Sequence, residues 1–335
     1  MVQSTATSQE KSVPPSSLLA RHPLVSYFVL AYALAWLLWL PLVLSKGGGI
    51  GLIPFTTPAD LGLHLTLLII CIGGLGPALA AFIMSACVGG WAEVKQLLRR
   101  MVQVRAGIQW YLLALFIPFG AILVSALLLG GTAVAQDVFS LQGGVGLLVY
   151  IITTFIDMVF GTPIGEEPGW RGFALPRLQQ SYGALRGSLI LGPLWALWHL
   201  PLFFTVWGAF YQRIGVLFGL LWFILIIMSY TLVMTWIFNN TRGSLFLAIL
   251  FHSAIDTIVF ESSTTANLRG FLVVTLTWVV IAVLVIGLTK GRLSYKRTVS
   301  TEAQTPVEQN QPMEEERESE RLVIPAMHSE DGSKA

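Results

Sequence analysis

A small set of ionisable side chains lies within or at the ends of strongly apolar stretches of this sequence. The six that could share one site are Glu166, Glu167, Arg171, His199, His252 and Asp256. A carboxylate can take a proton from water as a general base while nearby imidazoles polarise a carbonyl group. Two histidines and a carboxylate could equally hold zinc and leave a fourth position open for water.

The two adjacent glutamates are expected to have different roles. The glycines and prolines around them disfavour a continuous helix, and Pro168 suits the first position of a new one. Glu167 would then lie at or near the helix cap, four residues before Arg171, in the order that favours an ion pair. Glu166 has no such partner. The spacing predicts a structural role for Glu167 and a chemical role for Glu166, although an ordinary loop ion pair would explain the motif taken alone.

Each histidine has a possible partner one helical turn away. Trp195 precedes His199 by four residues, and Asp256 follows His252 by four, so each pair shares one helix face. Asp256 could orient the His252 ring, bind a metal or hydrogen-bond a reacting carbonyl. Each motif alone also fits a simpler interpretation, in which a buried histidine bonds a backbone carbonyl or a His–Asp pair fixes helix packing.

The elements that must position these residues are membrane helices. Of 335 residues, 55% are hydrophobic and 11% are charged, whereas soluble domains carry about 25% charged residues. The net charge of +2 argues against nucleic acid as a partner. Cys71 and Cys87 lie in one apolar run and lack the spacing of a disulfide framework or a zinc site. The composition predicts an all-α, polytopic membrane protein whose surroundings are the lipid bilayer.

Eight apolar stretches are long enough to cross a hydrocarbon core of about 30 Å as helices. They cover approximately residues 24–44, 61–88, 108–129, 145–162, 188–207, 214–238, 243–260 and 270–289. The chain is accordingly divided into four parts. These are a flexible N-terminal segment (1–23), three N-terminal membrane helices (24–143), a catalytic membrane core (144–289), and a basic stretch with a disordered acidic tail (290–335).

Lysine and arginine are concentrated in alternate links between these stretches. Basic residues next to membrane helices favour the cytoplasmic side, so both termini and the two glutamates are expected there, in a protein of the plasma membrane. Measured from that side, His199 lies roughly 17 Å and His252 roughly 14 Å along its helix, at 1.5 Å per residue. The two histidines are therefore expected at matching depths.

In their order along the chain, the motifs resemble the type II CAAX prenyl endopeptidases and bacteriocin-processing proteins. This family is also called the CPBP intramembrane metalloproteases, and its members share the Abi domain. The resemblance covers about residues 151–260, and Gly-Trp-Arg-Gly-Phe-Ala-Leu-Pro after the glutamates adds to it. The residues that carry it are Glu166, Glu167, Arg171, Trp195, His199, His252 and Asp256.

The resemblance implies an intramembrane endopeptidase that cleaves a membrane-associated peptide or protein, lipidated or not, in a conical cavity facing the cytoplasm. Glu166 would activate water, while His199 and His252 would position it or, together with Glu166, bind a metal, for which zinc is the candidate. Asp256 would lie near the developing oxyanion, either protonated or as a ligand, because an ionised carboxylate cannot donate a hydrogen bond. The remaining motif residues would support this site.

Two other functions would use the same residues. A non-catalytic protein of this fold, such as an immunity or scaffold protein, would use the cavity for binding alone. A proton-coupled carrier would use the carboxylates and imidazoles as a relay. The presence of every motif position favours the peptidase over the first, and clustering near one side of the membrane disfavours the second.

Overall fold

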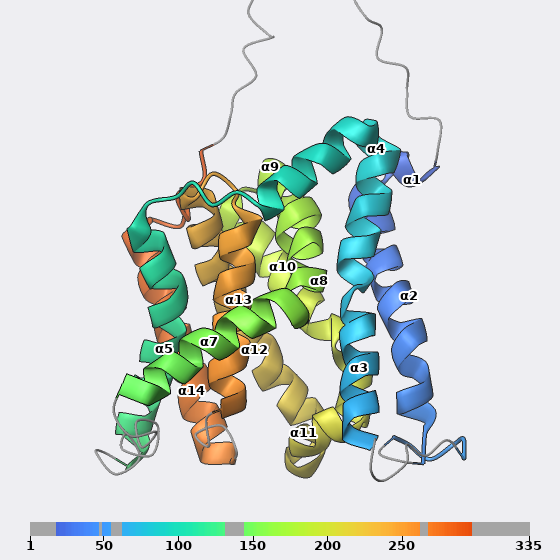
Figure 1. Cartoon of the computed structure of the whole chain (residues 1–335), viewed down its shortest axis with the longest axis vertical. Helices are drawn as coiled ribbons and strands as arrows, with labels where there is room; N and C mark the ends of the chain where they lie inside the picture. The colour runs from blue at the N-terminus through green and yellow to red at the C-terminus, as the bar shows by residue number, and fades with distance from the viewer. Residues whose placement is uncertain (1–17, 47–48, 55–61, 131–143, 262–266, 297–335) are drawn as a thin grey trace, which may run out of the picture. The chain divides into compact units, whose positions relative to one another are not determined.

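The computed structural model describes residues 18–46, 49–54, 62–130, 144–261 and 267–296. Within these ranges the chain forms helices joined by short links, with one isolated parallel bridge between Ser45 and Ile53. The described residues form one compact unit, and Figure 1 shows its helices packed side by side. The predicted all-α fold is confirmed. Most of the expected N-terminal segment and all of the expected acidic tail lie outside the described residues.

The helices have the following bounds. In chain order they are α1 (Leu18–Arg21), α2 (Pro23–Leu44), α3 (Gly62–Gly74), α4 (Gly76–Met101), α5 (Ile108–Gly130), α7 (Gly144–Phe160), α8 (Pro163–Glu167), the π-helical turn η1 (Pro168–Ala174), α9 (Leu175–Tyr182), α10 (Ala184–Trp198), the 3-10 turns η2 (Leu200–Phe204) and η3 (Val206–Gly208), α11 (Ala209–Ile214), α12 (Val216–Asn240), α13 (Leu245–Glu261) and α14 (Leu268–Leu288).

Six helical stretches of the described chain are long and apolar enough to cross a membrane. They are Pro23–Leu44, Leu68–Met101, Ile108–Gly130, Ala184–Phe204, Val216–Asn240 and Leu268–Leu288. A seventh is added if Gly146–Phe160 and Pro163–Tyr182, bent by 49° at their junction, form one span. The apolar part of α13, Leu245–Ile258, is shorter. The chain is thus a polytopic membrane protein, and its described residues contain six or seven spans by length and composition where eight were predicted for the chain.

The predicted interruption of the helix beside the glutamates is present as a bend just before them. The chain bends between α7 and α8, whereas Glu167 (φ −64°, ψ −33°) and Pro168 (φ −58°, ψ −30°) both have helical backbone angles. Proline fits a helix in its φ angle but cannot donate to the carbonyl four residues earlier. The wider turn η1 accommodates this loss. As expected, Pro168 begins a new turn, η1, and Glu167 lies at its N-cap position, but the Glu167 side chain makes no cap hydrogen bond. Both glutamates therefore lie within one continuous helical segment, about 100° apart around its axis.

Small residues let this segment lie directly against its neighbours. A Cβ on Gly165 would lie 2.6 Å from the carbonyl oxygen of Gly74, and one on Gly169 would lie 2.6 Å from Cβ of Pro77. A larger side chain at Gly165 would push α8 away from the end of α3, and one at Gly169 would push η1 away from α4. The same segment packs on α13, and α10 packs on α12 and α9, so the elements that carry the predicted residues meet inside the helix bundle.

Candidate active site

Glu166 is buried, with 2% of its surface exposed, and two indole groups hold one of its oxygens. Trp195 Nε1 donates to Oε2 at 2.7 Å, and Trp170 Nε1 donates to the same atom at 3.2 Å. Its other oxygen, Oε1, has no hydrogen bond within the described chain and is not sealed from solvent. Trp170 follows Glu166 by four residues, so the expectation that Glu166 lacks a partner at that spacing was wrong.

Glu167 links the predicted arginine to one of the histidines. Its Oε1 accepts from Arg171 Nη1 at 2.7 Å and from His252 Nδ1 at 2.8 Å, and both Glu167 and Arg171 are fully buried. The Arg171 guanidinium also lies 4.2 Å from the centre of the Trp195 ring, a cation–π contact. The predicted Glu167–Arg171 pair is present in the structure. The contact between Glu167 and His252 was not predicted, because Glu166 was the glutamate expected to face the histidines.

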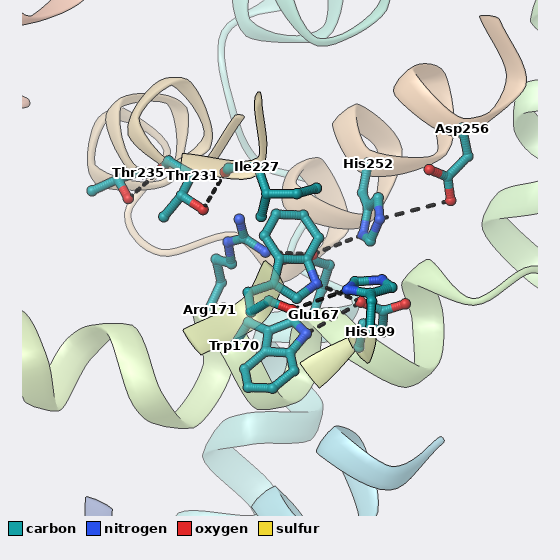
Figure 2. A network of polar contacts seen from close by, with 11 residues as sticks. Glu167, Trp170, Arg171, His199, Ile227, Thr231, Thr235, His252 and Asp256 are labelled. Carbon is teal, nitrogen blue, oxygen red and sulfur yellow. Dashed lines mark hydrogen bonds and ion pairs between the residues drawn. The ribbon is translucent and has the colours of Figure 1, made fainter. Parts of the chain in front are cut away.

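The two edges of the His252 ring have different surroundings. An ionised carboxylate only accepts hydrogen bonds, so Nδ1 carries the proton in the contact with Glu167. On the opposite edge, Nε2 lies 3.7 Å from Asp256 Oδ2, beyond hydrogen-bond distance, and the Asp256 side chain is 40% exposed. Figure 2 shows His252 between these two carboxylates. Glu167, rather than Asp256, therefore orients the ring, and Nε2 faces the more open side.

His199 lies at the C-terminal end of α10. Pro201 cannot donate a backbone hydrogen bond, the helix ends at Trp198, and its last carbonyl groups become available. His199 Nδ1 uses one of them, the carbonyl of Trp195, at 3.0 Å. The ring of Trp195 is 6.3 Å from His199 and 5.1 Å from His252, between centroids. Both histidines thus pack against Trp195, and each uses its Nδ1 in a hydrogen bond. The Nε2 atom of each ring is left for other partners.

A helix outside the motif region also supports the end of α10. On α2, Tyr32 donates to the carbonyl of Leu194, and Trp36 Nε1 donates to that of Trp198 at 2.8 Å. In return, Trp198 Nε1 donates to the carbonyl of Ala31 at 3.3 Å. These bonds fix the last turn before His199. The sequence offered no signal for them, since α2 is separated from α10 by about half of the chain.

The donor atoms fit the expected zinc site only in part. The two imidazoles have the hydrogen-bonding pattern that is usual for metal-bound histidines, in which Nδ1 is bonded to an acceptor and Nε2 is free. However, Oε2 of Glu166 is occupied by two indole groups. Across the described ranges, no three His, Cys, Asp or Glu side chains lie close enough together to hold a metal ion. The arrangement therefore does not form the expected three-ligand centre of His199, His252 and Glu166.

We expect Trp195→Phe to lower the rate of any reaction that uses Glu166. Phenylalanine keeps an aromatic ring beside both histidines but removes the stronger of the two N–H donors to the carboxylate. Loss of a hydrogen bond to a charged group costs about 1.5–3 kcal/mol, so kcat should fall by roughly ten- to a hundredfold. Trp170→Phe, which removes the longer bond, should have a smaller effect.

The matched control for these variants is Trp222→Phe. Trp222 lies on α12, where its ring packs against Phe218, and its indole donates no hydrogen bond within the described chain. Steady-state kinetics on the three variants would show which of them loses most in kcat. Equal losses in all three would mean that the indole donors do not act on Glu166.

The fold and the site together define a polytopic membrane protein with a buried centre of two glutamates, an arginine and two histidines. Residues 147–258, which include every predicted site residue, match the family model described as type II CAAX prenyl endopeptidase Rce1-like. Over this segment the chain is similar to the CAAX prenyl endopeptidase family that its motifs resemble.

A search of curated proteins found a relative in the archaeon Methanococcus maripaludis, named CAAX prenyl protease 2. The two chains are 30% identical over 146 residues, which cover 42% of this chain and 52% of the relative. The chain therefore aligns with about half the length of the curated relative it matches. Helices α2, α4 and α14 lie outside the segment that the family model matches.

Proposed function

We propose that this protein is an intramembrane endopeptidase that hydrolyses a peptide bond in a membrane-associated substrate. The observation that carries the proposal is the hydrogen bonding of the Glu166 carboxylate. One carboxylate oxygen is fixed by two indole donors, while the other is free, and Trp195 connects this carboxylate to both histidines. A buried base held in one orientation, with one unoccupied oxygen, suits proton abstraction from water.

In the proposed reaction, Oε1 of Glu166 takes a proton from a water molecule as its oxygen attacks the scissile carbonyl carbon. His199 and His252 offer Nε2 to the reacting groups. A ring protonated at Nε2 donates to the carbonyl oxygen as negative charge develops there, and an unprotonated ring accepts a hydrogen bond from the attacking water. Glu166 then passes its proton to the leaving amine as the C–N bond breaks.

The remaining motif residues would act on the histidines and not on the substrate bond. Glu167 and Arg171 would hold His252 through Nδ1, so that Nε2 keeps its direction during turnover. Asp256, half-exposed at 3.7 Å from that nitrogen, would stabilise the ring electrostatically when it carries a positive charge. With both termini in the cytoplasm of a plasma-membrane protein, the substrate would approach from the cytoplasmic side.

The name of the curated relative suggests a prenylated CAAX peptide as the first substrate class to test. Purified protein in lipid nanodiscs would be incubated with a farnesylated peptide that ends in a CAAX sequence, and with the same peptide lacking the lipid. Mass spectrometry would detect the released C-terminal tripeptide. Cleavage of either peptide supports the proposal. Failure to cleave these and other membrane-tethered peptides would contradict it and favour a binding role.

A chelator should leave this activity unchanged. Because the donors do not converge on a three-ligand centre, the proposed water activation depends on Glu166 without a metal. Dialysis against 1,10-phenanthroline followed by metal analysis and peptide hydrolysis tests this expectation. Activity that falls with the metal content and returns on addition of zinc would instead assign a metal to His199 and His252.

A further inference from the structure

Arg100, in the last turn of α4, forms hydrogen bonds with three backbone carbonyl groups. Its Nη1 donates to Gly172 at 3.0 Å, its Nη2 to Arg171 at 3.3 Å, and its Nε to Gly243 at 3.0 Å. The guanidinium also lies 5.1 Å from the centre of the Phe238 ring. Arg100 is outside residues 147–258 and therefore outside the segment that the family comparison covers.

The three carbonyl groups belong to two segments that adjoin Glu167 and the helix of His252. Two of them lie in η1, which continues directly from Glu167, and the third lies two residues before the start of α13, which carries His252. Glu167, the last residue of α8, bonds His252 on α13 at 2.8 Å. The continuous segment α8–η1 is therefore linked to α13 and the residues just before it twice, once inside the site and once at Arg100. Because a helix is stiff over two or three turns, spacing set at Arg100 also affects spacing at the site.

The link depends on a planar, branched cation. A guanidinium presents several N–H donors in a fixed fork, whereas a lysine ammonium is a point charge that cannot reproduce this geometry. The fit around it is close: Gly243 has a φ angle of +74°, and a Cβ there would lie 3.2 Å from Nη2 of Arg100. Nearby, Ser244 Oγ donates to the carbonyl of Gln103 at 2.6 Å, which also holds the end of α4 against the start of α13.

We propose that Arg100 is a positioning residue that sets the hydrogen bond between Glu167 and His252. It touches neither the substrate nor the reacting water and acts through the spacing of η1 and α13. The kinetic part of its test rests on the proposed peptidase function, and the spectroscopic part does not.

In the kinetic test, Arg100→Gln should lower kcat roughly ten- to a hundredfold, because small displacements of catalytic groups have effects of this size. KM should stay the same. Arg100→Lys should not restore the rate, and Arg99→Gln, an exposed neighbour on the same turn, should match the wild type. In a Glu167→Gln background, Arg100→Gln should lower kcat little further, since both changes disturb the same interaction. Losses that multiply in the double variant would overturn the proposal.

The spectroscopic test needs no substrate. The chain has five histidines, so ¹⁵N-histidine labelling gives few signals, and His252→Gln assigns the one from His252. Arg100→Gln should shift the His252 ring nitrogens, and Arg99→Gln should not. Gly243→Ala, which crowds the guanidinium without removing it, should shift the same signal. An unchanged His252 signal in the folded Arg100 and Gly243 variants would overturn the proposal. A shift in a protein that cleaves no peptide would support it while contradicting the peptidase function.

Discussion

Glu166→Gln should abolish peptide hydrolysis and leave the fold intact. The amide has nearly the size of the carboxylate, and its oxygen can still accept from the indole groups of Trp170 and Trp195. It cannot take a proton from water, however, and a positioned general base contributes about 10²–10⁴-fold to rate. We expect kcat to fall by at least that range, because the one unpaired oxygen of Glu167, Oε2, is sealed from solvent and so cannot replace Glu166 as the base that meets water.

Initial rates at saturating peptide, together with thermal unfolding of the same samples, would measure this effect. Glu93→Gln is the matched control, since Glu93 is a partly exposed glutamate paired with Arg177 and takes no part in the proposed chemistry. Its rate should equal that of the wild type. A Glu166→Gln protein that is folded and hydrolyses peptide at a rate close to the wild type would refute the assigned role of Glu166.

Arg171→Leu should cause the largest loss of stability among single changes in the site. The Arg171 and Glu167 side chains are both fully buried and 2.7 Å apart, so removal of the arginine leaves a buried carboxylate with only His252 to compensate it. Breaking a buried ion pair in this way costs about 3–5 kcal/mol. For a compact unit of this size, the melting temperature should fall by roughly 10 °C.

Thermal unfolding followed by tryptophan fluorescence, in one detergent throughout, would measure this loss. Arg177→Leu is the control, because its partner Glu93 and its own side chain are 23% and 21% exposed, and such pairs contribute about 0–1 kcal/mol. The double change Glu167→Gln with Arg171→Met should be more stable than Arg171→Met alone, since it removes the unpaired charge. A double variant that is less stable than the single one would show that charge burial is not the cause.

The sequence alone predicted the residues of the site and the contacts made within one helix. Residues four apart share a helix face whatever surrounds them, so Glu167 with Arg171 and Trp195 beside His199 could be predicted. The pair Glu166–Trp170 obeys the same rule and was missed because only oppositely charged partners were considered. The apolar runs likewise identified the membrane helices, although α13 is shorter than a spanning helix.

Contacts between helices were decided by the tertiary structure. Glu167 and His252 are separated by 85 residues, and Arg100 and Gly243 by 143, so no local spacing specifies them. They depend on how far each helix is rotated about its axis and how closely it approaches its neighbours. Here the π-helical turn after Pro168 sets the rotation of both glutamates, and Gly165 and Gly169 set the approach. Sequence spacing therefore indicated that one glutamate would face the histidines, and packing determined that Glu167 bonds His252 while Glu166 is held by two tryptophans with one oxygen free.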